Sequence, residues 1–267
     1  AGGLSEGFIR AGYEAIAHIE MDHYACDSLK TRAAFHYLKE NEKLDIYEDY
    51  LKNKKEKTDG SWLWNQVPKH VIDSVIQEAI GKETLPSLFE KVDKLCNGKP
   101  IDMIIGGPPC QAYSVAGRAR LGKKIEEDPR NNLYKFYVEF LKRYRPKMFV
   151  FENVLGILTA KGGEPFRDLI RLVRELDYDI DFREQIASQH GVLQKRHRVI
   201  IVGWQKKRDT QENTSYHYPY LLEEQMPYKI MKDLFCDLPV IKAGEGTLCG
   251  IVHYTKPLAD MEYLKAS

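Results

Sequence analysis

Hydrophobic residues along this chain fall into two patterns, short apolar runs and longer segments with helical spacing. Short runs rich in β-branched and aromatic residues predict buried strands, and apolar residues at every third or fourth position predict amphipathic helices. The predicted strands include residues 101–105, 147–151, 179–187 and 198–204. The predicted helices include residues 85–95, 133–144 and 166–176. This order indicates an α/β fold with a mostly parallel sheet and helices on both of its faces.

The amino-terminal residues have the pattern of a nucleotide-binding unit. A glycine turn at Gly2 and Gly3 precedes a short helix, expected from Ser5 to Gly12, and residues 13–20 alternate like a strand. In such units a carboxylate at the end of the second strand commonly binds ribose hydroxyls. Glu20 occupies that position, and a solvated helix-capping acid is the alternative interpretation.

The next segments carry fewer chemical signals. Residues 22–35 are expected to be helical, and residues 39–69 are polar and lysine-rich, which we interpret as an inserted surface excursion without chemistry. Val71–Ile72 resembles a short third strand that ends at Asp73. This strand would bring the Asp73 carboxylate to the same sheet edge as Glu20, although a loop or N-cap aspartate fits the pattern equally well.

Cys110 directly follows the predicted strand 101–105, in the sequence Gly-Gly-Pro-Pro-Cys. Ligands of open α/β sheets bind outside the carboxyl ends of the strands. The two glycines allow close backbone approach, and the two prolines restrict φ and remove N–H donors. A structural cysteine in a turn is the alternative. The glycine–proline context at a strand end favours a nucleophile on a stiff loop.

Three further features lie near predicted strand ends. Residues 114–124 are small and basic, which predicts a mobile loop able to close over a phosphate backbone. Glu152 follows the strand 147–151 and is a candidate proton donor. Gln194, Arg196 and Arg198 alternate along a segment expected to be extended, so their side chains point to one side. Two guanidiniums on one side repel unless they share an anionic or carbonyl partner, which favours a site.

Composition and charge restrict the possible settings. The chain has 267 residues, of which 43% are hydrophobic and 30% charged, and its net charge is +1. No apolar run approaches the roughly 20 residues that span a bilayer, so we expect a soluble protein. Five widely spaced cysteines without a C-x-x-C pair favour neither disulfides nor zinc and fit a reducing compartment. Local basic clusters permit a nucleic-acid partner without requiring one.

Three short motifs carry a family resemblance. Pro-Pro-Cys-Gln, Glu-Asn-Val and Gln-Lys-Arg-His-Arg occur in this order, and together they resemble the signature elements of the DNA cytosine-5 methyltransferases of bacterial type. Ala1-Gly2-Gly3-Leu4 is similar to the end of that family's glycine-rich cofactor turn, and Asp128-x-Arg130 to its helix-opening element. The resemblance covers residues 1 to about 204 and implies a Rossmann-like fold that uses S-adenosylmethionine.

The resemblance implies a covalent mechanism on a cytosine that is flipped out of duplex DNA. Cys110 adds to C6 of the base, which makes C5 nucleophilic towards the sulfonium methyl group of the cofactor. Glu152 stabilises the adduct at N3, and Arg198 binds the O2 carbonyl. Arg196 supports that contact or orients Glu152. Loss of the C5 proton then expels the thiol and leaves S-adenosylhomocysteine as the second product.

The resemblance also assigns binding residues, and it implies no metal. The expected cofactor contacts are Gly2, Gly3, Glu20, Met21, Asp73, Pro108 and Leu133. The expected DNA contacts are Gln111, Ser114, Arg118, Arg120 and Lys123. Met21 stands where the family often has an aromatic residue, but a thioether can also cover the face of a ring.

The expected domain organisation is that of a fragment. Residues 1–204 would form the catalytic domain, with an insertion at 39–69 and a catalytic loop at 114–127, and residues 205–267 would begin the target-recognition region. The start of the cofactor motif and the family's two closing motifs are not found, so the isolated chain is expected to bind cofactor weakly and to turn over little or not at all.

Two alternatives stay open, a transfer-RNA cytosine-5 methyltransferase and a DNA-binding fragment without catalysis. The leading interpretation is a monomer in the bacterial cytoplasm. Its partner is double-stranded DNA, with no membrane contact and with room for a cognate restriction endonuclease.

Overall fold

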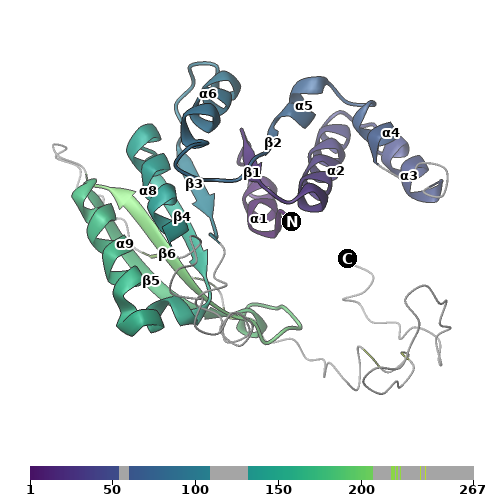
Figure 1. The fold of residues 1–267 in the computed structure, drawn as a ribbon. Helices are drawn as coiled ribbons and strands as arrows, with labels where there is room; N and C mark the ends of the chain where they lie inside the picture. The colour runs from purple at the N-terminus through teal and green to yellow at the C-terminus, as the bar shows by residue number, and fades with distance from the viewer. Residues whose placement is uncertain are drawn as a thin grey trace, which may run out of the picture. The chain divides into compact units, whose positions relative to one another are not determined.

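The computed structural model describes residues 1–53, 60–108 and 132–206, together with residues 218, 219, 221, 223, 235 and 238. Its helices and strands (Figure 1) are, in chain order, α1 (Gly3–Arg10), β1 (His18–Glu20), α2 (His23–Glu40), α3 (Leu44–Lys52), α4 (Ser61–Trp64), α5 (Lys69–Asp73), β2 (Val75–Gln77), α6 (Leu85–Cys96), β3 (Met103–Gly106), α8 (Leu133–Tyr144), β4 (Met148–Asn153), α9 (Glu164–Glu175), β5 (Tyr178–Ile186) and β6 (His197–Gln205). The chain divides into two compact units, residues 1–183 with 199–218 and residues 184–198 with 219–267.

The strands form a Rossmann-like α/β arrangement. β1 pairs in parallel with β2, and β3 pairs in parallel with β4. β6 runs antiparallel to β4 and completes a sheet with the order β3-β4-β6-β5. β4 is buried on both faces over Phe149–Phe151, which explains its nearly continuous apolar run.

Alternate residues of β4 face two different helical layers. Phe149 and Phe151 are buried in a core formed with α8 and α9, whereas Val150 packs with Val202 on the other face, where Phe8 of α1 also packs. Helices therefore cover both faces of the sheet, as the sequence pattern predicted.

The predicted helices over 85–95, 133–144 and 166–176 are confirmed as α6, α8 and α9, with ends that differ by at most two residues. α6 and α8 each end at a residue with left-handed backbone geometry, at Asn97 and at Arg145, both with φ of 47°. A left-handed residue is a common helix terminator, and Pro146 cannot continue the second helix.

The amino-terminal expectations need correction. α1 begins at Gly3 instead of Ser5, and only residues 18–20 of the predicted strand 13–20 are in β1. Val71 and Ile72, predicted as a strand, lie in α5, which follows Pro68. Their side chains pack against a helical core, because α5 contacts α2. The strand expected in this region follows that helix and is β2.

Residues 39–69, which we expected to form a surface excursion, instead contribute helices and a hydrophobic core. The described residues of this segment form α3 and α4 around a core that includes the buried side chains of Leu38, Tyr50, Leu63 and Val67. Lys30 lies over the ring of Trp64, with the ammonium nitrogen 4.9 Å from the ring centroid. The aromatic residues of this segment therefore build a small hydrophobic core despite the surrounding lysines.

Two of the five cysteines, Cys26 and Cys96, are described, and both are free and buried. Among the described residues, no helix combines the length and apolar character needed to cross a membrane. Within the same ranges, no group of three or more His, Cys, Asp or Glu side chains is arranged to bind a metal ion.

Candidate active site

The approach to the predicted nucleophile lies directly beside Glu152. β3 ends at Gly106, and the chain continues through Gly107 and Pro108. A Cβ atom added to Gly107 would lie 2.7 Å from Oε2 of Glu152 and 3.2 Å from its backbone oxygen. Any larger residue at position 107 would force Glu152 or the backbone to move, so only glycine fits here. The structure thus places the Glu152 carboxylate against Gly107, which precedes Cys110 by three residues in the sequence.

Cys110 itself lies outside the described residues. The same holds for the predicted DNA contacts Gln111, Ser114, Arg118, Arg120 and Lys123, and for the Asp128-x-Arg130 element. Their roles remain predictions.

Asn153 is a site residue that the sequence analysis missed. Its side-chain Nδ2 donates a hydrogen bond to the backbone oxygen of Pro108 at 3.2 Å, and its Oδ1 accepts one from the backbone N–H of Val154 at 2.9 Å. The side chain is buried, with 3% exposure. Because proline has no N–H, Pro108 offers only its carbonyl group for such a contact. A polar residue at the end of an apolar strand, next to Glu152, was the available signal.

Replacing Asn153 with aspartate should therefore destabilise the loop entrance. A carboxylate cannot donate to the Pro108 carbonyl and would oppose its oxygen with a negative charge. We expect the free energy of unfolding to fall by about 1–3 kcal/mol, as measured by urea denaturation. The exposed Asn97 provides a matched control, because Asn97→Asp changes the same group at a helix end. Equal effects of the two substitutions would show that the Pro108 contact contributes nothing.

Tyr137 of α8 contacts both β3 and β4. Its hydroxyl lies 3.1 Å from the backbone oxygens of both Ile104 and Val150. A Cβ atom on Gly106 would lie 2.9 Å from its ring. Burial raises the pKa of Tyr137 well above its ordinary value, so the hydroxyl keeps its proton and acts as a donor. β3 and β4 are thus fixed together just before the loop.

The predicted ribose contact, Glu20, ends β1 with one oxygen already bonded. Its Oε1 accepts hydrogen bonds from the backbone N–H groups of Met21, at 2.8 Å, and Asp22, at 3.0 Å. Its Oε2 accepts no hydrogen bond from any residue in the described ranges. Met21 is 67% exposed, which leaves its thioether accessible. A fixed carboxylate with one available oxygen, beside an accessible apolar side chain, fits a ribose and an adenine ring.

The expected placement of Asp73 is wrong. It lies in α5, before β2, and therefore at the amino-terminal end of that strand. In the parallel pair, Glu20 is opposite Gln77, and the next residue, Glu78, donates its backbone N–H to the backbone oxygen of Glu20 at 2.9 Å. The Glu78 carboxylate pairs with Lys91 at 2.7 Å. Glu78 is thus the acid beside Glu20, and the first acid after the apolar residues 75–76 was its signal.

The remaining predicted cofactor residues are described as well. Gly2 has a left-handed φ of 82°, and a Cβ atom there would lie 3.0 Å from Leu29, so a larger residue would be strained. Gly3 begins α1, and Leu133 begins α8 and is half-buried.

Arg196 and Arg198 belong to the second unit, residues 184–198 with 219–267. Arg198 is half-buried in β6, and its Nη1 donates to the backbone oxygen of His197 at 2.7 Å. The expected extended run from Gln194 is wrong, since this residue lies in a bend where the N–H of Arg196 bonds to its oxygen at 2.9 Å. A local turn occupies this segment, and the strand β6 begins only at His197.

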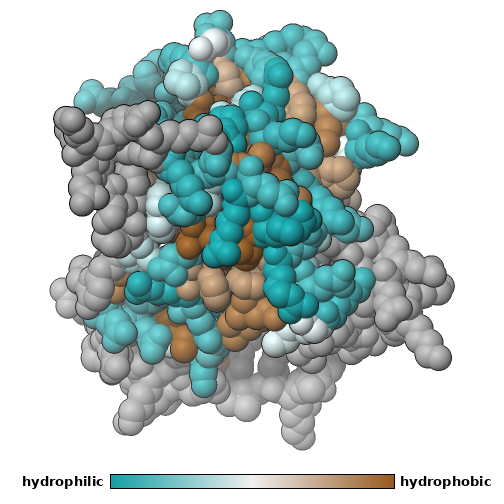
Figure 2. All heavy atoms as spheres, turned by 90° about the vertical axis from the view of Figure 1, so that its left-hand side faces the viewer, coloured by the Kyte–Doolittle hydropathy of each residue, from teal (hydrophilic) through white to brown (hydrophobic). Residues whose placement is uncertain are grey.

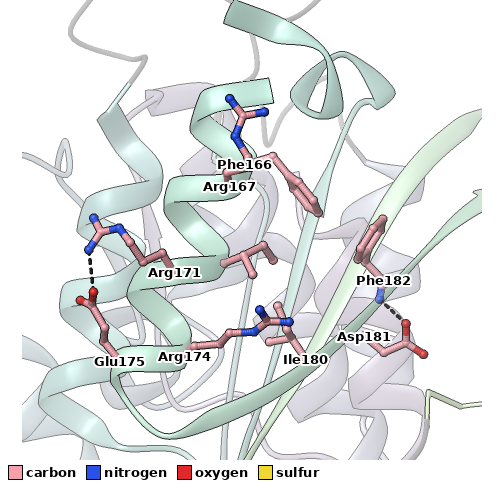
Figure 3. Close-up of a pocket in the computed structure, with 9 residues that line it drawn as sticks. Phe166, Arg167, Arg171, Arg174, Glu175, Ile180, Asp181 and Phe182 are labelled. Atoms are coloured by element: carbon pink, nitrogen blue, oxygen red, sulfur yellow. Dashed lines mark hydrogen bonds and ion pairs between the residues drawn. The ribbon is translucent and has the colours of Figure 1, made fainter. Parts of the chain in front are cut away.

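A surface groove of about 630 Å³ lies between α9 and β5. Figure 2 faces the side that carries α9, where hydrophobic surface appears among hydrophilic side chains. Phe166 and Phe182 meet edge to face in this groove, with ring centroids 4.8 Å apart (Figure 3). Arg171 pairs with Asp168 and Glu175. None of the predicted site residues that the structure describes lines the groove.

Comparisons with known proteins identify the family of this chain. The family model described as C-5 cytosine-specific DNA methylase matches residues 77–247. The chain is 31% identical to Type II methyltransferase M.Bpa9945I of Bacillus paralicheniformis, over 92% of this chain and 60% of that protein. It is 27% identical to M1.HphI of Haemophilus parahaemolyticus, over 99% of this chain and 59% of that protein. It is 33% identical to M.FnuDI of Fusobacterium nucleatum, over 89% of this chain and 53% of that protein.

The chain thus spans between about half and three fifths of the length of these relatives. The match to the family model covers most of the chain, including Glu152 and the segment that contains Cys110. The chain belongs to the C-5 cytosine-specific DNA methylase family.

Proposed function

We propose that the protein to which this chain belongs transfers a methyl group from S-adenosylmethionine to C5 of cytosine in double-stranded DNA. One observation carries this proposal: the Glu152 carboxylate lies against Gly107, three residues before Cys110, in a chain of the cytosine-specific family. Because the chain spans only part of its relatives, the activity is proposed for the whole protein.

The carboxyl ends of β1 and β2 suit the cofactor. Glu20 accepts hydrogen bonds from the ribose hydroxyls through its Oε2. Met21 covers one face of the adenine. Glu78, which follows Gln77 at this edge, replaces Asp73 as the acceptor for the adenine amino group. Gly2, Gly3, Pro108 and Leu133 complete the wall of the pocket. When bound, S-adenosylmethionine supplies an electrophilic methyl group on its sulfonium sulfur.

Cys110, Glu152 and Arg198 are proposed to activate the base. Cytosine C5 is a poor nucleophile, so the Cys110 thiolate first forms a bond to C6, and the electron pair of the 5,6 double bond becomes available at C5. Glu152 donates a proton or hydrogen bond to N3, which stabilises the adduct. Arg198 binds the O2 oxygen, and Arg196 supports this contact. C5 then forms a bond to the methyl group, whose bond to sulfur breaks and leaves S-adenosylhomocysteine. When a base removes the C5 proton, the double bond re-forms and the thiolate leaves.

The target base must leave the duplex before Cys110 can reach C6. Gln111, Ser114, Arg118, Arg120 and Lys123 are proposed to contact the DNA around the vacated position, with the basic side chains on phosphates. A monomer in the bacterial cytoplasm and a cognate restriction endonuclease are part of the same proposal. The names and sources of the Type II relatives support that setting.

Methyl transfer to defined substrates tests the proposal. The full-length protein, incubated with methyl-labelled S-adenosylmethionine and duplex DNA, should label cytosine C5, and the Cys110→Ser variant should label nothing. Label on adenine, or label that persists in Cys110→Ser, would contradict the mechanism. A parallel reaction with transfer RNA separates the two polymers, since greater labelling of the RNA would favour the transfer-RNA alternative.

A further inference from the structure

The position of α1 depends on a small number of contacts. This helix begins at Gly3, contains no fully buried residue, and packs on the sheet through the partly buried Phe8. Apolar burial normally fixes a helix in a protein. For α1 this contribution is small, so polar contacts must decide where the Gly2–Gly3 turn lies.

Glu6 supplies the ionic contacts between α1 and α2. Its Oε2 lies 2.8 Å from Nη1 of Arg32 and 2.9 Å from Nε2 of His36, both on α2. Its Oε1 lies 2.7 Å from Nε of Arg10 on its own helix. The Glu6 side chain is only 16% exposed. The hydrogen bond from His36, followed by the hydrogen bond from Arg10 and the nearby charges of His36 and Arg32, outweighs burial and lowers the pKa of Glu6 to about 2, so the carboxylate is ionised at neutral pH.

Arg32 connects this carboxylate to the glycine turn. A Cβ atom on Gly2 would lie 3.1 Å from Cδ of Arg32 and 3.0 Å from Leu29. The side chain that Glu6 orients therefore forms the wall behind Gly2. Without that ion pair, Arg32 would be free to leave the turn, because long charged side chains adopt many rotamers.

A second set of hydrogen bonds meets at Gly2. The backbone oxygen of this residue accepts from Ser5 Oγ at 3.0 Å and from the Glu6 N–H at 2.9 Å. Ser5 Oγ lies 3.2 Å from Nε2 of His18. Since the hydroxyl proton points to Gly2, the oxygen accepts from His18. Burial lowers the pKa of His18, so its ring is neutral and donates through Nε2. The turn is thus fixed from β1 as well as from α2.

We propose that Glu6 is a positioning residue for the cofactor: through Arg32 and His36 it fixes α1 and the Gly2–Gly3 turn against α2. The inference rests on the proposed function, in which this turn binds S-adenosylmethionine. In this proposal Glu6 acts only through these neighbours and contacts neither cofactor nor DNA. Its loss should therefore weaken cofactor binding and leave the affinity for DNA unchanged.

Calorimetric titration with S-adenosylhomocysteine tests this inference in the full-length protein. Glu6→Gln keeps the size of the side chain and removes its charge, and we expect the Kd to rise about tenfold or more. Glu90→Gln is the matched control, because Glu90 forms an exposed ion pair with Lys94 at 2.7 Å and lies away from the turn. The control should bind like the wild type. Both variants are measured well below their melting temperatures.

A purely structural role of Glu6 predicts a different outcome. General loosening would raise the KM for DNA together with that for S-adenosylmethionine, whereas positioning raises only the latter. A Kd within twofold of the wild type, or an equal rise in both KM values, would overturn the inference. A wild-type protein that binds no S-adenosylhomocysteine would instead overturn the proposed function, and this inference with it.

Discussion

Replacing Gly107 with alanine should lower kcat of the full-length protein by about 100-fold or more. The new Cβ atom would lie 2.7 Å from Oε2 and 3.2 Å from the backbone oxygen of Glu152, so either the carboxylate or the loop must move. Displacements of about 1 Å at a reacting centre can reduce the rate about 100-fold. Gly107 precedes Cys110, the proposed nucleophile, by only three residues, so we expect a shift at this contact to affect both proposed catalytic groups.

Steady-state kinetics with thermal denaturation can separate this effect from unfolding. Gly7→Ala is the matched control, since Gly7 lies within α1 and has no atom within 4 Å of its Cβ position. Alanine there should keep kcat and slightly increase stability. If Gly107→Ala retained kcat near that of the control, Glu152 would not lie against the loop during catalysis.

Replacing Gly203 with alanine should destabilise the fold by about 3 kcal/mol, at the upper end of the cost of overpacking a core. Gly203 is opposite Phe149 in the antiparallel pair of β4 and β6. A Cβ atom at this position would overlap carbons Cε1 and Cζ of the Phe149 ring and lie 2.8 Å from Cδ1. Phe149 is 1% exposed and packs edge to face on Tyr178, so its ring has little room to shift.

A double-mutant cycle in urea tests the cause of this loss. If the ring is responsible, Phe149→Leu should make room for the extra methyl group, and the double variant should be more stable than the sum of the single effects by about 1 kcal/mol or more. Additive effects would show that the methyl group disturbs the strand itself and not Phe149.

The helices and the main sheet were largely predictable because their signals are local. Apolar spacing placed α8 at residues 133–144, and the left-handed residues Asn97 and Arg145 end helices where the pattern stops. The failures arose where short apolar runs fit two structures. Val71–Ile72 has strand composition, but it packs as a helix against α2, and the strand follows four residues later. Tertiary packing decides such cases.

The candidate site was predictable as far as strand ends determine it. Gly107 follows β3, Glu152 lies near the end of the neighbouring parallel strand β4, and the structure places the Glu152 carboxylate against Gly107. Asp73 failed because residues 71–72 are helical and the strand begins only at Val75, so the acid precedes the strand and lies at its opposite end. Asn153 was missed because its role depends on the carbonyl of Pro108, a partner 45 positions away in the sequence. Contacts of this kind leave no periodic signal.

Trapping with DNA that contains 5-fluorocytosine tests the central claim most directly. Fluorine at C5 prevents the final elimination, so the adduct formed by the cysteine persists and can be located by mass spectrometry. In the presence of S-adenosylmethionine, the full-length protein should form a covalent complex with this DNA through Cys110, and Cys110→Ser should form none. A complex through another residue, or methylation of ordinary cytosine without any trapped complex, would contradict the account.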